Sequence, residues 1–264
     1  NLSIFFILSY YMDSHIKLLS TIGLTGVLII LLLMTAFKFK NSNIGFTCNR
    51  YILNTYLYVF LSFVIISLTL TTAEHNKVQF LPTLPAFLGL FFLSLVFLIF
   101  TNMITPNTSG GIVLKHVLWL GFLLVLGMLF YPMYSHFTDN KIIVSAIITT
   151  LALVLLLSIV AFKKPELISL TWGPVLFTLL VTVIIFEIAT MILVPKLRFN
   201  PNSYLYKGVS YFVILLFIFY ILYDTKMMTI RAKKCNNNAD YINESLHLFL
   251  DIFNIFVRIL SLQR

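Results

Sequence analysis

The chain has 264 residues, of which 60% are hydrophobic and only 10% are charged. This composition excludes an ordinary soluble fold, because the surface facing water would be largely apolar. The formal net charge of +9 does not indicate nucleic-acid binding, since the basic residues stand singly or in pairs at the ends of apolar runs, as cytoplasmic anchors do. We expect no nucleic-acid partner.

Apolar runs bounded by charged residues, Pro or Asn follow one another along the chain. About 20 apolar residues are needed to cross the roughly 30 Å of a bilayer's hydrocarbon core. The predicted spans are 17–37, 51–71, 82–103, 112–134, 142–162, 168–194, 205–224 and, more weakly, 244–262. Runs this long and uniformly apolar are helices and not barrel strands. The sequence therefore predicts an all-α polytopic membrane protein, surrounded by the lipid bilayer.

The span at 17–37 contains Gly23 and Gly26 and is predicted to be a peripheral anchor. Met12 precedes it as a plausible start, so the first eleven residues carry little weight. We expect an N-terminal extension at 1–45 with this additional helix, followed by a transmembrane domain at 46–264.

The distribution of Lys and Arg predicts an orientation. Alternating spans place the connections 38–50, 163–167 and 225–243 on one side, with nine basic residues against five on the other side. The positive-inside rule therefore makes that side cytoplasmic. Cys48 and Cys235 both lie on it, and with no zinc-like spacing of Cys and His they are predicted to be free thiols.

Charged residues inside spans are costly, so they are candidates for function. They are Asp224, Asp251, Glu187, Arg258, Lys115 and His116. Lys115 and His116 begin a span and are expected to extend to the interface, and His136 ends that span. Asp224 closes the seventh predicted span, and Asp251 lies within the eighth.

A polar stripe runs along the last predicted helix. His247, Asp251, Asn254 and Arg258 share one face at helical spacing. Because this stripe must face protein or water, we predict a buried helix in the middle of a bundle. The alternative is an amphipathic helix lying on the membrane surface.

Two C-terminal segments carry a family resemblance. Tyr223-Asp-Thr at the end of one span, a basic and Asn-rich loop, and then Leu248-Phe-Leu-Asp-Ile-Phe-Asn-Ile-Phe resemble the paired motifs of the transmembrane Bax inhibitor motif family. That family includes the Bax inhibitor, LifeGuard and Golgi anti-apoptotic proteins. Residues 50–59 and 130–136 resemble its first and third helices less strongly. The likeness covers roughly 48–264 and indicates a divergent member, such as a viral one.

The resemblance implies a seven-helix bundle with a central C-terminal helix, here preceded by one extra span. It also implies a pH-sensitive calcium leak that modulates intracellular stores and inhibits apoptosis, with Asp224 and Asp251 as a proton-sharing latch and weak calcium site. Two adjacent buried carboxylates cannot both ionise cheaply, so the pair is expected to titrate as a unit. Two carboxylates also fall short of the six to eight oxygens that Ca²⁺ prefers, which suits a permeant ion. Implied partners are calcium, protons and cell-death regulators of the Bcl-2 type. The implied location is the endoplasmic reticulum or Golgi, or the plasma membrane in a bacterium.

The chain departs from the family at one position. Better-known members have an arginine near the aspartates on the second family helix, whereas the matching residues 98–105 contain none. Arg258 and Glu187 offer a substitute network, because an isolated charge at depth is costly unless it is paired. The alternative is a neutral, hydrogen-bonded Glu187.

Other functions are predicted less well by these residues. A non-conducting scaffold that binds partner membrane proteins stays open as an alternative. A seven-helix receptor lacks its usual motifs, and a secondary transporter lacks paired Gly/Pro-broken helices. With no nucleophile beside a base and no metal-ligand cluster, we expect neither an enzyme nor a bound cofactor.

Overall fold

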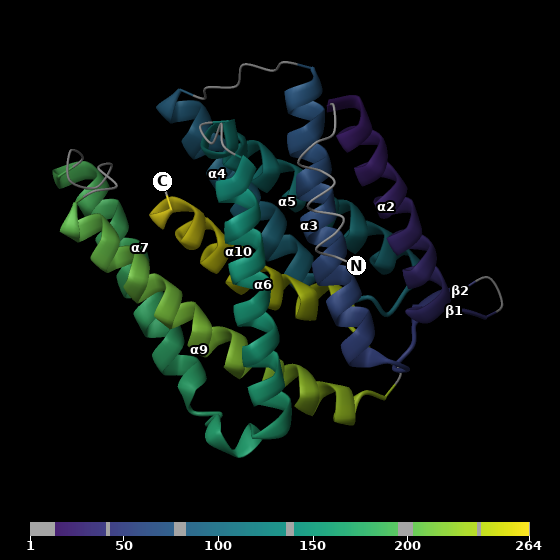
Figure 1. Ribbon diagram of the computed structural model, residues 1–264. Coiled ribbons are helices and arrows are strands. Elements are labelled where there is room, and N and C mark those ends of the chain that lie inside the picture. The colour runs from purple at the N-terminus through teal and green to yellow at the C-terminus, as the bar shows by residue number, and fades with distance from the viewer. Residues whose placement is uncertain are drawn as a thin grey trace. The chain divides into compact units, whose positions relative to one another are not determined.

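The computed structural model describes residues 14–40, 43–76, 83–135, 140–194, 203–236 and 239–263 (Figure 1). Its elements are α2 (Ser14–Thr35), β1 (Phe37–Lys40), β2 (Asn43–Phe46), α3 (Tyr51–His75), α4 (Leu84–Met103), α5 (Ser109–Ser135), α6 (Asn140–Lys163), the 3-10 helix η1 (Pro165–Leu167), α7 (Trp172–Leu193), α9 (Tyr204–Lys234) and α10 (Tyr241–Leu262). In the described part of the chain, eight helices are long and apolar enough to cross a membrane. The prediction of an all-α polytopic membrane protein is confirmed.

The helices α4 and α7 begin where their sequences favour it. Pro85 and Pro174 lie in their first turns, where a missing backbone N–H costs nothing. Their outer surfaces are apolar and exposed, as lipid requires.

The helix α9 is longer than its apolar run. The seventh span was predicted to end at Asp224, but the helix continues to Lys234, a length of 31 residues. At 1.5 Å per residue it measures about 46 Å, well beyond the hydrocarbon core. Residues 225–234 include Lys, Met, Arg and Ala, which favour helix once the chain has left the lipid. Asp224 therefore lies inside a helix and not at its end.

A two-stranded antiparallel hairpin follows α2, with Phe37 opposite Phe46 and Lys38 opposite Gly45. From the sequence we expect only a connection there. The alternating pattern of β1, Phe37-Lys-Phe-Lys, covers only four residues. A pattern this short does not distinguish a strand from a loop, because the strand depends on packing that the sequence does not show.

The chain forms two compact units, which are described separately. The first comprises 1–138 and 231–246. In it, α2 packs against α3, α4 packs against α5, and α3 packs against α5. Figure 1 shows α2 lying along α3. Gly127 on α5 allows a close approach to α3, because a Cβ there would lie 3.0 Å from the Thr69 side chain.

An aromatic cluster forms the core of this first unit. It gathers Phe46, Tyr58, His116, Trp119 and Tyr241, with ring centroids 5.1 to 6.3 Å apart in the contacting pairs. Tyr58, Trp119 and Tyr241 are buried. The cluster joins the hairpin, α3, α5 and the first turn of α10, residues that are far apart in the sequence.

The second unit comprises 139–230 and 247–264. It contains α6, α7, most of α9 and the remainder of α10. Over its most apolar stretch α10 is 56% buried, compared with 17% for α7 and 22% for α6. The last helix is therefore buried in the protein, which excludes the alternative of a helix lying on the membrane surface.

Candidate functional site: a buried carboxyl pair

The candidate site lies where α9 and α10 bring Asp224 and Asp251 together. The two carboxyl groups are hydrogen-bonded to each other. Asp251 is 5% exposed, and Asp224 is half-buried. An ionised carboxylate only accepts hydrogen bonds, so a bond between two carboxyls requires a proton on one of them. The pair is therefore suited to sharing one proton.

One oxygen of this pair has no partner. Asp251 Oδ2 is buried without a hydrogen bond, and so is the Thr225 hydroxyl, which follows Asp224 directly on α9. A buried acceptor left unsatisfied costs roughly 1–3 kcal/mol. Such an oxygen is available for a proton, a water molecule or a cation.

Tyr220 is a neighbour of the pair that the sequence did not single out. It lies one turn before Asp224 on α9, and its hydroxyl is within electrostatic range of both carboxyls. The spacing of four residues from Asp224 was the available signal. Tyr220 thus adds a phenol to the surroundings of the pair.

The other predicted residues of the polar stripe lie in different surroundings. Asn254 is half-buried and its amide donates to Leu250 O of its own helix at 2.8 Å. His247 is exposed, whereas Asp251 one turn later is buried.

Glu187 on α7 and Arg258 on α10 form an ion pair. Their side chains are 22% and 14% exposed. The structure thus brings together the two residues that the sequence suggested as a substitute network, and Glu187 is not a lone neutral acid. Whether this pair takes part in the site's function stays a prediction.

Breaking this ion pair should destabilise the second unit. Arg258→Ala leaves Glu187 without its guanidinium in an apolar region, and we expect a loss of about 2–3 kcal/mol in the free energy of unfolding. The charge-swapped protein with Glu187→Arg and Arg258→Glu should regain most of the lost stability. Thermal unfolding in detergent micelles measures the effect, and a swap no more stable than either single variant would contradict it.

Two other charged residues of the spans depart from expectation. Lys115 does not extend to the interface: it is fully buried, with its ammonium 2.6 Å from Asp240 Oδ2 and 2.7 Å from Ile104 O. His116 lies in the aromatic cluster, where Nδ1 donates to Ile112 O and Nε2 is 2.8 Å from the Tyr58 hydroxyl. Hydrogen-bond partners within the protein satisfy both residues, so neither needs to reach water. His136 is outside the described residues.

The first turn of α10 is anchored by three side chains. Asp240 binds Lys115 and also accepts from the backbone N–H of Asn243, as an N-cap does. Glu244 pairs with Arg231 at 2.7 Å, which joins the end of α9 to the start of α10. The Tyr241 hydroxyl donates to Thr47 O. These contacts fix where the helix that carries Asp251 begins.

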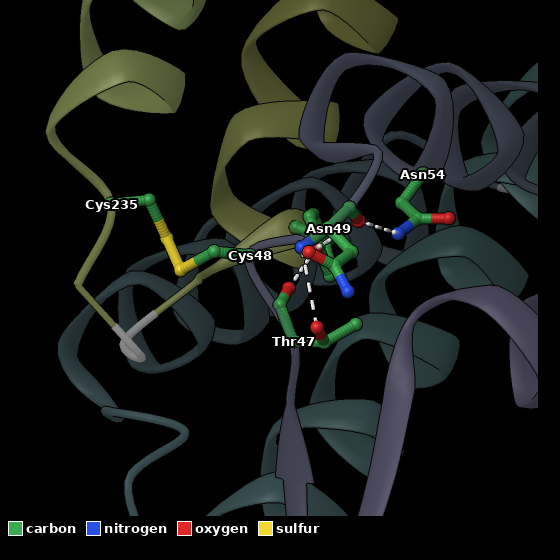
Figure 2. The surroundings of a disulfide bond; sticks show 6 residues. Thr47, Cys48, Asn49, Asn54 and Cys235 are labelled. Atoms are coloured by element: carbon green, nitrogen blue, oxygen red, sulfur yellow. Dashed lines mark hydrogen bonds between the residues drawn. A yellow bond between two sulfur atoms is a disulfide. The ribbon is translucent and has the colours of Figure 1, made fainter.

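Cys48 and Cys235 form a disulfide, with their Cα atoms 5.9 Å apart (Figure 2). The prediction of free thiols is therefore wrong. The two cysteines are separated by 187 residues, and only the tertiary packing of the first unit brings them together. The bond joins the segment before α3 to the start of the connection between α9 and α10.

Together, these observations define a polytopic all-α membrane protein whose last two helices hold a buried carboxyl pair. A family model described as inhibitor of apoptosis-promoting Bax1 matches residues 48–263. The chain belongs to this Bax inhibitor family, which confirms the resemblance seen in the C-terminal motifs. α2 and the hairpin precede the matched residues.

A curated relative shares part of the chain. The BI1-like protein of Arabidopsis thaliana is 34% identical over 131 residues, which cover 48% of this chain and 46% of the plant protein. The match thus spans about half the length of each protein.

Proposed function

We propose that this protein is a proton-regulated calcium leak in the membrane of an intracellular calcium store. The observation that carries the proposal is the pair of hydrogen-bonded carboxyls of Asp224 and Asp251, one of which has a buried oxygen without a partner. A shared proton holds α9 and α10 together at that point. Loss of the proton leaves two like charges side by side in a poorly solvated region, which favours separation of the two helices.

Calcium is the cargo in this proposal and not a resident ion. Within the described ranges, no group of three or more His, Cys, Asp and Glu residues could hold a metal. Two carboxylates with carbonyls and water would bind Ca²⁺ weakly, and an ion that is bound weakly can leave again. The ionised pair would therefore admit calcium without retaining it.

Inhibition of apoptosis is the cellular consequence that we propose. Membership in the Bax inhibitor family supports it, and a lower calcium content of the store would be its physical means. Regulators of the Bcl-2 type are the partners we would test first. A non-conducting scaffold that binds such partners is the alternative, because a bundle of this kind need not conduct to bind membrane proteins.

Calcium flux across a defined bilayer tests the proposal. The wild-type protein in liposomes should release trapped calcium several-fold faster at pH 8 than at pH 6, with an indicator dye outside. Liposomes without protein and liposomes loaded with Mg²⁺ are the controls, because Mg²⁺ sheds its water reluctantly. Flux no greater than that of empty liposomes at every pH would make the scaffold the better explanation.

A further inference from the structure

The disulfide lies in a basic and accessible part of the first unit. Cys48 and Cys235 are both half-buried. Arg50 follows Cys48 by two residues, and Lys233 and Lys234 directly precede Cys235. All three of these basic side chains are exposed.

The acidic residues close to Cys235 do not offset these charges. Asp240 is paired with the buried Lys115, and Glu244 is paired with Arg231. The exposed charged residues that flank Cys48 and Cys235 in the sequence are therefore basic on both sides of the bond. A positive field of this kind raises the local concentration of small anions and favours the thiolate form of a cysteine.

We propose that Cys48–Cys235 is a reversible redox site that exchanges with small anionic thiols of the glutathione type. In the reducing direction, a thiolate attacks one sulfur, breaks the S–S bond and forms a mixed disulfide with that cysteine, and the other cysteine leaves as a thiolate. A second anionic thiol then displaces the first. Two thiols give up two electrons and become one small-molecule disulfide, while Cys48 and Cys235 each end with a proton on sulfur. Oxidised glutathione drives the same steps in reverse.

A hydrogen bond between the two segments is independent of the S–S bond, and others order the Cys48 segment itself, as Figure 2 shows for Asn54 and Asn49. Asn54 Nδ2 donates to Asn49 O at 3.0 Å and to Thr35 O at 3.1 Å. Tyr241, six residues after Cys235, donates its hydroxyl to Thr47 O. Reduction therefore leaves the two thiols near each other, ready to form the bond again, and does not require the unit to unfold.

The predicted orientation agrees with a bond that opens and closes. The distribution of Lys and Arg places both cysteines on the cytoplasmic side, where persistent disulfides are rare and redox-sensing ones occur. The chain has just these two cysteines. Its redox state is thus reported by a single pair of thiols.

The rate of reduction by thiols of opposite charge tests the proposal. The oxidised protein in detergent is mixed with glutathione, which is anionic, or cysteamine, which is cationic, at equal thiolate concentration, and the thiols formed are counted by maleimide-polyethylene glycol gel shift. We expect reduction by glutathione to be several-fold faster at low salt, with the advantage falling as salt screens the charges. Separately, Cys235→Ser should take up one glutathione on Cys48 from oxidised glutathione, seen as the corresponding mass increase.

Charge variants make this test specific. The protein with Arg50→Gly, Lys233→Gln and Lys234→Gln should lose the preference for glutathione. Glycine suits position 50, because Arg50 has a φ of 53°. The matched control with Lys163→Gln and Lys164→Gln removes another exposed pair of lysines and should keep the preference. Equal rates for the two thiols, a preference that survives the triple variant, or a bond that glutathione does not reduce would each overturn the proposal.

Discussion

Lys115→Met should cost the protein about 2–4 kcal/mol of its free energy of unfolding, since it breaks a buried ion pair. The Lys115 side chain is 0% exposed and that of Asp240 is 25% exposed, so the remaining carboxylate would be only partly hydrated. Ile104 O at the end of α4 would also lose its donor. Thermal unfolding in detergent micelles, followed by near-ultraviolet circular dichroism, measures the change.

Two further variants identify the cause of this loss. Adding Asp240→Asn to Lys115→Met removes the unpaired charge while Asn keeps its capacity to cap α10, so most of the stability should return. Lys207→Met removes an exposed lysine of α9 and should change the free energy of unfolding by less than about 0.5 kcal/mol. A loss in Lys115→Met no larger than that in Lys207→Met would show that the ion pair does not anchor α10.

Asp251→Asn and Asp224→Asn should each abolish the dependence of calcium flux on pH. An amide donates a hydrogen bond to the remaining carboxylate at every pH, so each variant imitates the protonated pair and keeps α9 and α10 together. In the wild-type protein the pair keeps its proton at low pH and loses it as the pH rises, so flux should rise with pH. A like-charge repulsion of about 1.4 kcal/mol between the two carboxylates changes the ratio of open to closed forms about tenfold.

The liposome assay across pH 6 to 8 checks this prediction. Both variants should show low calcium flux that changes less than about twofold between pH 6 and pH 8. Over the same pH range, the ratio of open to closed forms of the wild-type protein should change up to about tenfold. Glu166→Gln is the matched control, because Glu166 is an exposed carboxylate in η1. A pH response that persists in both aspartate variants would place the proton-sensing group elsewhere in the protein.

The sequence predicted those parts of the site that can be recognised from a short stretch of neighbouring residues. Asp224 and Asp251 could be selected because a charge within an apolar run is costly and therefore conspicuous. Glu187 and Arg258 were paired by the same reasoning, and they form an ion pair in the structure. Tyr220 was missed because one more aromatic residue is inconspicuous in an aromatic-rich span, although it lies four residues before Asp224.

The partners of Lys115, Cys48 and Tyr241 could not be predicted. Lys115 meets Asp240 across 125 residues, Cys48 meets Cys235 across 187, and Tyr241 meets Thr47 across 194. A basic residue at the start of a span is interpreted as an interfacial anchor, because the sequence does not show that a distant carboxylate contacts it. Likewise, two isolated cysteines read as thiols until the packing places them side by side.

Sequence alone determined the class of protein and the number of apolar helices, because the thickness of a bilayer and the cost of unsatisfied backbone groups in lipid act on each segment locally. It also determined which carboxyls and which arginine lie inside the spans. Only the tertiary structure decided that α10 is buried and does not lie on the membrane surface, that Lys115 meets Asp240, and that a disulfide joins the two chain segments of the first unit. Those features depend on contacts between residues far apart in the chain, and hydropathy carries no information about them.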